Sequence, residues 1–289
     1  MMKQLALLLT LLLFAGLTAA AQHGTPFKLE CDKLPFEEIK GPTRAIDKQC
    51  GINGDLASNF SPVAKQNIAK NNFCAKGTPV KVTFATFDQL QKAAEAKQIP
   101  FHKKGLPPNR TVLKDLLKVA GGKSLGEGTI VTLEAFVIDA RHSNSKFFID
   151  SNGKPEDGEN VNCNSGELAD NDIHIELAES ASLLGFKDRC QGVTAEISPH
   201  FRPVAWDRFD VNDKTMAAAH GIPQLKGAKV RITGPLFFDA SHAPSTCAVP
   251  VPGQPARRSI WEIHPAYAID VFDTKTKKFV PLDQWAKDK

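Results

Sequence analysis

The second half of the chain carries the pattern of hydrophobic and polar residues that predicts β-strands. Residues 129–138 are rich in β-branched and aromatic side chains, and residues 172–177 alternate strictly between polar and apolar positions. Both patterns are typical of strands that bury one face. A polar, glycine-rich stretch at 152–171 has no apolar periodicity, so we expect a surface insertion there. The same criteria predict further strand segments at 146–150, 193–197, 229–238 and 260–272.

A helical segment is expected between the third and fourth of these strands. Residues 213–220 contain a run of alanines, and Gly221 and Pro223 beyond them are typical of a helix end. The predicted elements follow the order of the oligonucleotide/oligosaccharide-binding (OB) fold. This order is a strand, a second strand interrupted by the insertion, a third strand, a helix and two last strands. Gly234, in the fourth strand, fits a sharp bend of such a barrel. A β-sandwich is the alternative, but it needs about seven strands and has no central helix.

The residues before 127 combine loops with short helices. We expect one helix at 66–73 and a second that begins at Thr86 and ends before Pro100. Thr86 and Gln89 have the spacing of a capping box, with Thr86 as the N-cap. A third, amphipathic helix is expected at 111–119, with one apolar face formed by Val112, Leu116 and Val119.

The first residues have the pattern of a cleavable secretory signal peptide. Lys3 precedes an apolar run at 5–17, and the small residues Ala19 to Ala21 follow it. The apolar run is shorter than the roughly 20 residues that a spanning helix needs, which argues against a membrane anchor. We therefore expect cleavage after Ala20 or Ala21, a secreted or periplasmic protein, and no membrane span in the mature chain.

These patterns divide the chain into four parts. A signal peptide at 1–21 precedes a loop-rich, partly helical segment at 22–126, and the barrel domain occupies 127–273. Residues 274–289 contain five lysines and are expected to form a basic tail in solvent. The fold class is therefore mainly β with short helices (α+β), built around a five-stranded OB-like barrel.

All six cysteines lie after the signal peptide. An even number of cysteines in an exported chain indicates disulfides, and no pair has the C-x-x-C spacing of a zinc or redox site. Sequence alone does not determine the pairing, but we expect at least two bridges. The preferred pair is Cys50 with Cys74, the next is Cys163 with Cys190, and Cys31 with Cys247 remains by exclusion.

The charge balance argues against a nucleic acid as the main partner. The chain has 36 basic residues, one of which leaves with the signal peptide, against 32 acidic residues. A protein that holds a phosphate backbone is normally much more basic. Aromatic and basic residues that fit stacking on bases and contacts with phosphates are present nonetheless: Phe136, Phe147, Phe148, Lys229, Arg231, Arg257 and Arg258.

Two of the predicted strands each carry an acid and a histidine on one polar face, opposite their apolar residues. In the strand at 172–177 this face holds Asp172, His174 and Glu176. In the strand that begins at Ile260 it holds Glu262 and His264. If His174, Glu262 and His264 lie together, they could ligate a divalent metal or act as an acid–base pair, and His242, after the fourth strand, could join them. The alternative is a set of solvated or mutually hydrogen-bonded positions outside the barrel. No known metal-ligand spacing, nucleophile elbow or phosphate loop is present, so we assign no catalytic residue and no cofactor.

Several short motifs are similar to those of exported bacterial domains of unknown function. The resemblance covers about half of the chain and lies in residues 163–164, 172–177, 196–200, Trp206, 230–234 and 258–265, with 70–74 in the N-terminal part. It ends in the Trp-Glu-Ile-His-Pro motif at 261–265. The resemblance implies an OB-like fold and a bacterial origin, and it implies no activity.

The sequence indicates a binding protein more strongly than an enzyme. The leading interpretation is an exported, disulfide-stabilised OB-like protein with an unidentified ligand. A metal-dependent hydrolase that uses the histidine and glutamate face is one alternative, and an envelope-associated structural or interaction module is another. A concave, aromatic-lined barrel face would favour binding, whereas three or more of His174, His242, Glu262 and His264 around one point would favour the hydrolase.

Overall fold

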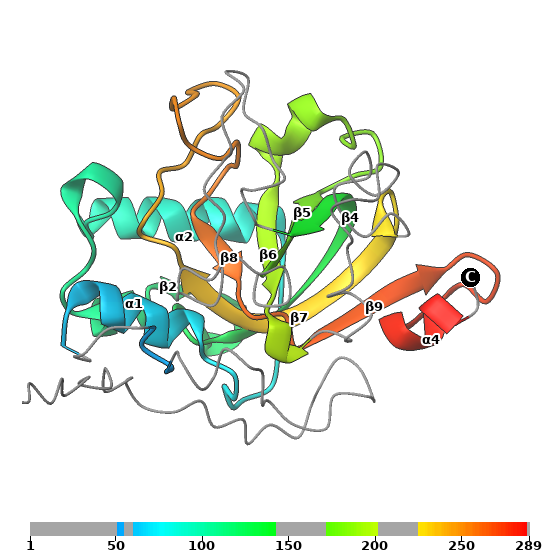
Figure 1. Ribbon diagram of the computed structural model, residues 1–289, viewed down its shortest axis with the longest axis horizontal. Coiled ribbons are helices and arrows are strands. Elements are labelled where there is room, and N and C mark those ends of the chain that lie inside the picture. Colours follow the sequence, from blue (N-terminus) through cyan, green and yellow to red (C-terminus); the bar gives the residue numbers. More distant parts are fainter. Residues whose placement is uncertain (1–50, 55–59, 143–171, 202–224, 288–289) are drawn as a thin grey trace, which may run out of the picture.

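Eight of the described strands form one twisted sheet, part of which closes into a barrel, and β2 and β3 form a separate pair. The computed structural model describes residues 51–54, 60–142, 172–201 and 225–287. Within them, the strand order is β1-β4-β5-β6-β8-β7-β9-β10, and β4 also pairs with β7. That additional pairing closes five strands into a barrel (Figure 1): β4 (Ile130–His142), β5 (Ile173–Ala178), β6 (Val193–Ile197), β8 (Trp261–Ile263) and β7 (Lys229–Phe238).

The connectivity of the barrel is that of the OB fold. β4 and β5, β5 and β6, β7 and β8, and β4 and β7 are antiparallel neighbours, whereas β6 and β8 are parallel. The first strand therefore pairs with both the second and the fourth, and the third pairs with the fifth, as in an OB barrel. The predicted OB-like α+β fold is confirmed. The expected strand segment at 146–150, the insertion at 152–171, the helix at 213–220 and the signal peptide lie outside the described residues.

The last predicted strand, 260–272, is divided into two strands. β8 ends at Ile263, and β9 (Ala268–Asp273) pairs with the first half of β7. Pro265 lies between them and has no backbone N–H to donate to a ladder. The chain also passes closely over Gly234, where an added Cβ would lie 2.4 Å from the carbonyl oxygen of Pro265. Gly234 thus allows the crossing of the two segments at the expected bend.

The predicted basic tail contains regular structure. β10 (Lys278–Pro281) forms a hairpin with β9, and α4 (Leu282–Lys287) follows it. Lys275 and Lys277 are exposed, as expected of solvated residues, but Leu282 and Trp285 are buried. The tail prediction is therefore corrected, because two apolar residues in this segment pack against the sheet.

The helices of the N-terminal part begin earlier than predicted. α1 (Pro62–Lys70) is capped by Ser61, whose hydroxyl accepts a hydrogen bond from the Ala64 N–H at 3.0 Å. α2 (Phe84–Ala96) is capped by Thr83 rather than Thr86. Thr86 occupies the third helical position, and its hydroxyl accepts from the Thr83 N–H at 3.1 Å. The earlier start brings Phe84 into the helix, where it is buried in the core.

The amphipathic helix expected at 111–119 is absent. A short 3-10 helix, η3 (Arg110–Leu113), is followed by β2 (Leu117–Lys118), which pairs with β3 (Ser124–Leu125). Asp115 has a φ of 49°, which ends the helical path, and Val112 is 43% exposed instead of facing the core. The described residues also form the short 3-10 helices η2 (His102–Lys104), η4 (Ala120–Gly122), η7 (Phe186–Gln191) and η8 (Pro199–Phe201).

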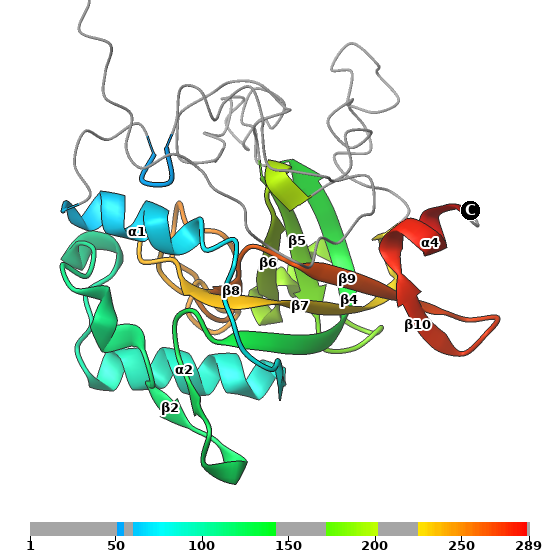
Figure 2. The same cartoon turned by 90° about the horizontal axis from the view of Figure 1, so that it is seen from below.

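The N-terminal part packs on the barrel and shares one hydrophobic core with it. Phe87 and Leu90 of α2 belong to the same buried cluster as Trp261 and Ile263 of β8. β1 (Val80–Val82) extends the sheet by pairing in parallel with β4. Figure 2 shows α1 and α2 at one end of the barrel and the β9–β10 hairpin with α4 at the other. Within the described residues, no helix has the length and apolar composition needed to cross a bilayer.

A disulfide connects the segment before β6 to the loop before β8. Cys190 is bonded to Cys247, with Cα atoms 5.0 Å apart. The predicted pairs Cys163–Cys190 and Cys31–Cys247 are therefore wrong. β6 and β8 are neighbours in the barrel despite their separation in sequence, and this brings the two cysteines together. Cys74 is also disulfide-bonded, to a cysteine outside the described residues. At least two bridges are thus confirmed, and Cys50–Cys74 stays a prediction.

Candidate functional site

Glu196 is the centre of a buried charged cluster on the outer face of the barrel. In the register of β5 and β6, His174 lies directly opposite Glu196. On the other side of β6, Ala195 pairs with Ile263, so His264 follows beside Glu196. The His174 Nε2 lies 2.8 Å from Glu196 Oε1, and the His264 Nε2 lies 3.1 Å from Glu196 Oε2. Two predicted site residues therefore meet at one carboxylate, with β6 between them.

Lys70 and Asp172 complete this cluster. Lys70 is the last residue of α1, and its Nζ lies 3.3 Å from Asp172 Oδ2 and 3.3 Å from Glu196 Oε2. The His264 Nε2 is 3.5 Å from Asp172 Oδ2. Lys70, Asp172, Glu196 and His264 are each 3% exposed or less. Burying such charges is costly unless they are paired, and here α1 supplies the ammonium that the two carboxylates of the barrel require.

The contacts of His264 favour a protonated ring. The Nδ1 lies 2.8 Å from the backbone carbonyl oxygen of Lys70, and this oxygen only accepts hydrogen bonds, so the Nδ1 carries a proton. The Nε2 lies 3.1 Å from Glu196 Oε2 and 3.5 Å from Asp172 Oδ2, and two carboxylates at these distances favour a proton on the Nε2 as well. Burial by itself would lower the pKa of His264, but the hydrogen bonds to Asp172 and Glu196 outweigh it and raise the pKa to about 9.

The same cluster contains three ligand atoms in a geometry that could hold a metal ion. Among the described residues, Asp172, Glu196 and His264 offer atoms within 4.8 Å of one another. The Lys70 Nζ, however, already lies 3.3 Å from an oxygen of each carboxylate, and a metal ion bound there would have to displace this ammonium. Burial by itself would raise the pKa values of Asp172 and Glu196. The cationic side chains beside them have the larger effect and lower both pKa values below their ordinary range, so both carboxylates are ionised beside Lys70 and His264. The residues present fit a salt-bridge cluster better than a metal centre.

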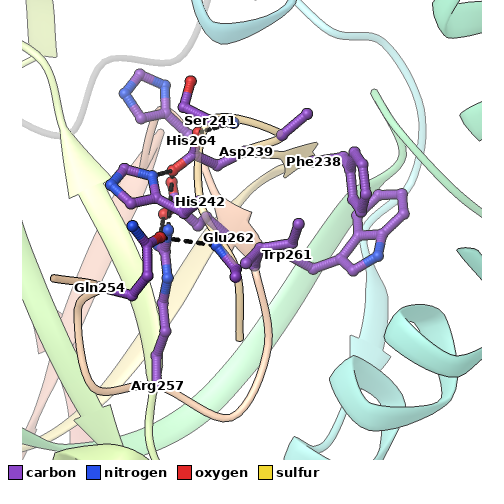
Figure 3. Close-up of polar contacts among 12 residues, drawn as sticks. Phe238, Asp239, Ser241, His242, Gln254, Arg257, Trp261, Glu262 and His264 are labelled. Carbon is purple, nitrogen blue, oxygen red and sulfur yellow. Dashed lines mark hydrogen bonds and ion pairs between the residues drawn. The ribbon is translucent and has the colours of Figure 1, made fainter. Parts of the chain in front are cut away.

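Arg257 connects a second cluster at the end of the barrel (Figure 3). Its Nη2 donates to Asp239 Oδ2 at 2.9 Å, and its Nη1 donates to Glu262. Asp239 directly follows β7 and also contacts the Nδ1 of His242 at 2.5 Å. Arg257, Asp239 and Glu262 are buried, whereas the His242 side chain is 27% exposed. The guanidinium therefore fastens the loop between β7 and β8 to the barrel wall.

The two carboxyl groups of the second cluster differ in pKa: the pKa of Asp239 is lowered, and the pKa of Glu262 is raised. Burial raises the pKa of Asp239, but His242 and Arg257 outweigh it and hold the pKa well below its usual range. The ionised Asp239 only accepts, so the His242 Nδ1 carries a proton and is oriented by the carboxylate. Burial, with Glu196 nearby, raises the pKa of Glu262 to about 8 despite Arg257.

The four predicted site residues therefore divide between two clusters. His174 and His264 belong to the Glu196 cluster, and His242 and Glu262 belong to the Arg257 cluster. His264 and Glu262, expected on the face away from the barrel interior, are each 1% exposed because α1 and the β7–β8 loop cover them. Sequence reasoning missed Lys70 and Glu196 as partners, although the alternation at 193–197 places Glu196 on the outer face. Their meeting depends on how α1 packs.

The basic residues that the sequence offers as phosphate contacts have acidic partners within the protein. Lys229 and Arg231 lie 3.8 Å and 3.2 Å from carboxylate oxygens of Glu134, and Arg231 points outward as expected, with 37% of its side chain exposed. Arg258 forms two hydrogen bonds to Asp88 in α2. Phe136 is half-buried in β4, and Phe147 and Phe148 lie outside the described residues. These cations therefore hold elements of the fold together.

A groove of about 960 Å³ lies beside α1. Its walls come from α1, residues 71–78, residues 109–115 around η3, and residues 127–130 at the start of β4. Apolar and cationic side chains share these walls, and Phe73 is the one aromatic residue among the described lining residues. This groove therefore differs from the concave, aromatic-lined barrel face that would favour binding. The described residues of the groove are Ile52, Lys65, Ile68, Ala69, 71–78, 109–111, Lys114, Asp115 and 127–130.

Comparisons with known proteins do not indicate a family or a function for this chain. No family model, no curated protein and no solved structure matches this chain. The site must therefore be interpreted from its own residues.

Proposed function

We propose that the protein is an exported, disulfide-stabilised OB-like binding protein whose ligand occupies the groove beside α1. The groove carries this proposal, because its volume of about 960 Å³ suits a small molecule. Export is supported by the signal-peptide pattern at 1–21 and by the Cys190–Cys247 bridge. The charged clusters, in contrast, satisfy their own charges and serve to fix the elements around the groove.

The groove is held open by hydrogen bonds between its walls and the end of β7. Gln66 of α1 accepts from the Ala240 N–H at 3.2 Å and from Arg110 at 3.2 Å. Arg110 donates to the carbonyl oxygen of Phe238 at 2.6 Å and to Glu127 Oε2 at 2.8 Å. Such a preformed site avoids the entropic cost of ordering its walls when a ligand binds.

A substitution that fills the groove tests the proposal. Ala69 is a half-buried residue of α1 that lines the groove, so Ala69→Trp places an indole inside it. The probes are dodecanoate, dodecyltrimethylammonium and dodecyl maltoside below their micelle concentrations, measured by isothermal titration calorimetry. We expect at least one probe to bind the wild-type protein with one site, and to bind the Ala69→Trp variant at least tenfold more weakly.

The control is Ala96→Trp, at the exposed end of α2 and outside the groove. It should bind the probe as the wild type does. If none of the three probes binds the wild-type protein, or if Ala69→Trp binds equally well, the groove is not the ligand site.

A metal-dependent hydrolase is the second candidate function, favoured by the closeness of Asp172, Glu196 and His264. A metal ion there would have to displace the Lys70 ammonium and a proton of His264. A rise in melting temperature with Zn²⁺ or Ni²⁺ that is lost in His264→Gln would support this candidate. We expect no such rise, because the two cations of the protein already neutralise both carboxylates.

A further inference from the structure

We propose that the ligand of the groove is an anionic amphiphile: an alkyl chain or similar apolar body with a single anionic oxygen headgroup. This inference rests on the proposed function of the groove and names the chemical class that its walls fit. It follows from three features of the lining residues, namely their net charge, the position of their apolar side chains, and the hydrogen bonds that their amide groups already make.

The rim of the groove has an excess of positive charge. Lys65, Lys76 and Lys114 line it, and Lys76 and Lys114 are exposed. Arg110 and Glu127 also line the groove, but they neutralise each other through two hydrogen bonds. Asp115 is the remaining acid among the described lining residues. Three lysines against one aspartate leave a net charge of +2, which favours a ligand with a negative headgroup.

The walls between these lysines are apolar. Ile68 and Ala69 of α1 are half-buried, as is Ala75 on the next segment, and all three line the groove. Phe73 and Ile130 lie behind them in the core. The small side chains of Ala69 and Ala75 leave width for a ligand. Apolar walls with a cationic rim suit an apolar body whose charge stays at the mouth of the groove.

Two of the amide groups that line the groove already make hydrogen bonds within the protein, which leaves fewer of them for a neutral, hydroxyl-rich ligand such as a sugar. Asn71 Nδ2 donates to the carbonyl oxygen of Ile52 at 2.9 Å. The Oδ1 of Asn109 accepts from the N–H of Thr111 at 3.0 Å and from its hydroxyl at 2.7 Å. These donors and acceptors are used within the protein. The Lys65 Nζ likewise donates to the Pro108 carbonyl oxygen at 2.6 Å, so the exposed ammonium groups of Lys76 and Lys114 are the headgroup contacts that the structure supplies.

The charge of the probe tests this inference. Dodecanoate, dodecyltrimethylammonium and dodecyl maltoside share one alkyl chain and differ in headgroup charge. We expect dodecanoate to bind at least tenfold more tightly than the cationic probe. Each of Lys76→Glu and Lys114→Glu should weaken dodecanoate binding by about threefold to tenfold and strengthen binding of the cationic probe. Lys92→Glu, exposed on α2 and outside the groove, should change neither.

The length of the probe tests the apolar half of the inference. Octanoate, decanoate and dodecanoate should gain affinity by about fourfold for each added methylene group while the chain stays within the groove. Dodecyl phosphate, as a second anionic headgroup, should also bind more tightly than the cationic probe. If the cationic or neutral probe binds as tightly as dodecanoate, or if the affinity does not depend on chain length, the ligand class is wrong. In those outcomes a probe still binds the groove, whereas binding of no probe would contradict the proposed function itself.

Discussion

His264 illustrates how single hydrogen bonds determine the chemistry of a residue. The period of two in its strand predicts only that it points away from the barrel interior. Its contacts with the Lys70 carbonyl oxygen and with two carboxylates favour the protonated ring. A residue that the sequence offers as a metal ligand therefore joins α1 to the barrel through these contacts.

Removing this cation should destabilise the protein strongly. His264→Ala removes a cation that contacts both buried carboxylates, Asp172 and Glu196, and breaking such a buried charge pair costs about 3–5 kcal/mol in the free energy of unfolding. His174→Ala is the control, because His174 is 24% exposed and contacts the same Glu196; it should cost about 1 kcal/mol. Urea unfolding at pH 6.5 measures both. Equal losses would show that His264 has no special role.

The contribution of His264 should also depend on pH. Its pKa is about 9 in the folded protein and about 6.5 in the unfolded chain, so its stabilisation is complete below pH 6.5 and is lost as the pH rises through 9. A shift of this size corresponds to about 3 kcal/mol. Glu262, with its raised pKa, acts in the same direction. Between pH 6.5 and 9.5 the wild type should lose more stability than His264→Ala; parallel curves would contradict this assignment.

At the scale of elements, the contact between Gly234 and the β8–β9 crossing decides how the last strands are arranged. β7 pairs with β8 through residues 236–238 and with β9 through residues 230–233, and Gly234 lies between these two ladders. The absence of a side chain at Gly234 lets the segment around Pro265 cross it closely. A single glycine therefore allows one long strand to pair with two different partners.

A methyl group at this position should disturb both ladders. In Gly234→Ala the new Cβ would lie 2.4 Å from the Pro265 carbonyl oxygen and 2.8 Å from Ile263 Cγ2, so the backbone must shift. We expect a loss of about 1–3 kcal/mol in the free energy of unfolding. Gly185→Ala is the control, because its closest contact is the flexible end of the Asp188 side chain. Thermal unfolding compares the two, and a Gly234→Ala variant as stable as Gly185→Ala would contradict the close approach.

At the scale of the whole molecule, long-range links hold the N-terminal helices, the β7–β8 loop and the barrel together. Lys70 connects α1 to β6, Arg258 connects α2 to the β7–β8 loop, and the Cys190–Cys247 bridge fastens this loop near β6. The described parts on either side of residue 127 share one core and unfold, we expect, as one unit.

The bridge should contribute much of this stability. It joins residues separated by 57 positions, and closing a loop of that length restricts the unfolded chain by about 4 kcal/mol. The double variant Cys190→Ser, Cys247→Ser should lose about 2–4 kcal/mol in urea unfolding and leave the Cys74 bridge intact. Mass mapping of the non-reduced wild type provides the control. Recovery of Cys190 linked to Cys163 would contradict the pairing.

The sequence by itself determined the order of the barrel strands, because local patterns of β-branched, aromatic and alternating residues mark them. The predicted segments 193–197 and 229–238 match β6 and β7 residue for residue. The apolar residues that alternate along these segments are buried in the core. Local sequence signals gave the wrong boundaries where contacts with the rest of the fold also act on the same residues. Thr83, and not Thr86, caps α2. The helix predicted at 111–119 is replaced by η3, whose first residue, Arg110, donates a hydrogen bond to the distant Phe238 carbonyl oxygen.

Only the tertiary structure decided the pairing of Cys190 with Cys247, the protonation of His264 and the existence of the groove. Each joins residues far apart in the chain: the groove needs α1, η3 and the start of β4 side by side, and His264 needs the carbonyl oxygen of Lys70. Periodicity reports which face a residue occupies. It does not report which other segment covers that face, because this depends on how the helices and loops pack around the closed barrel.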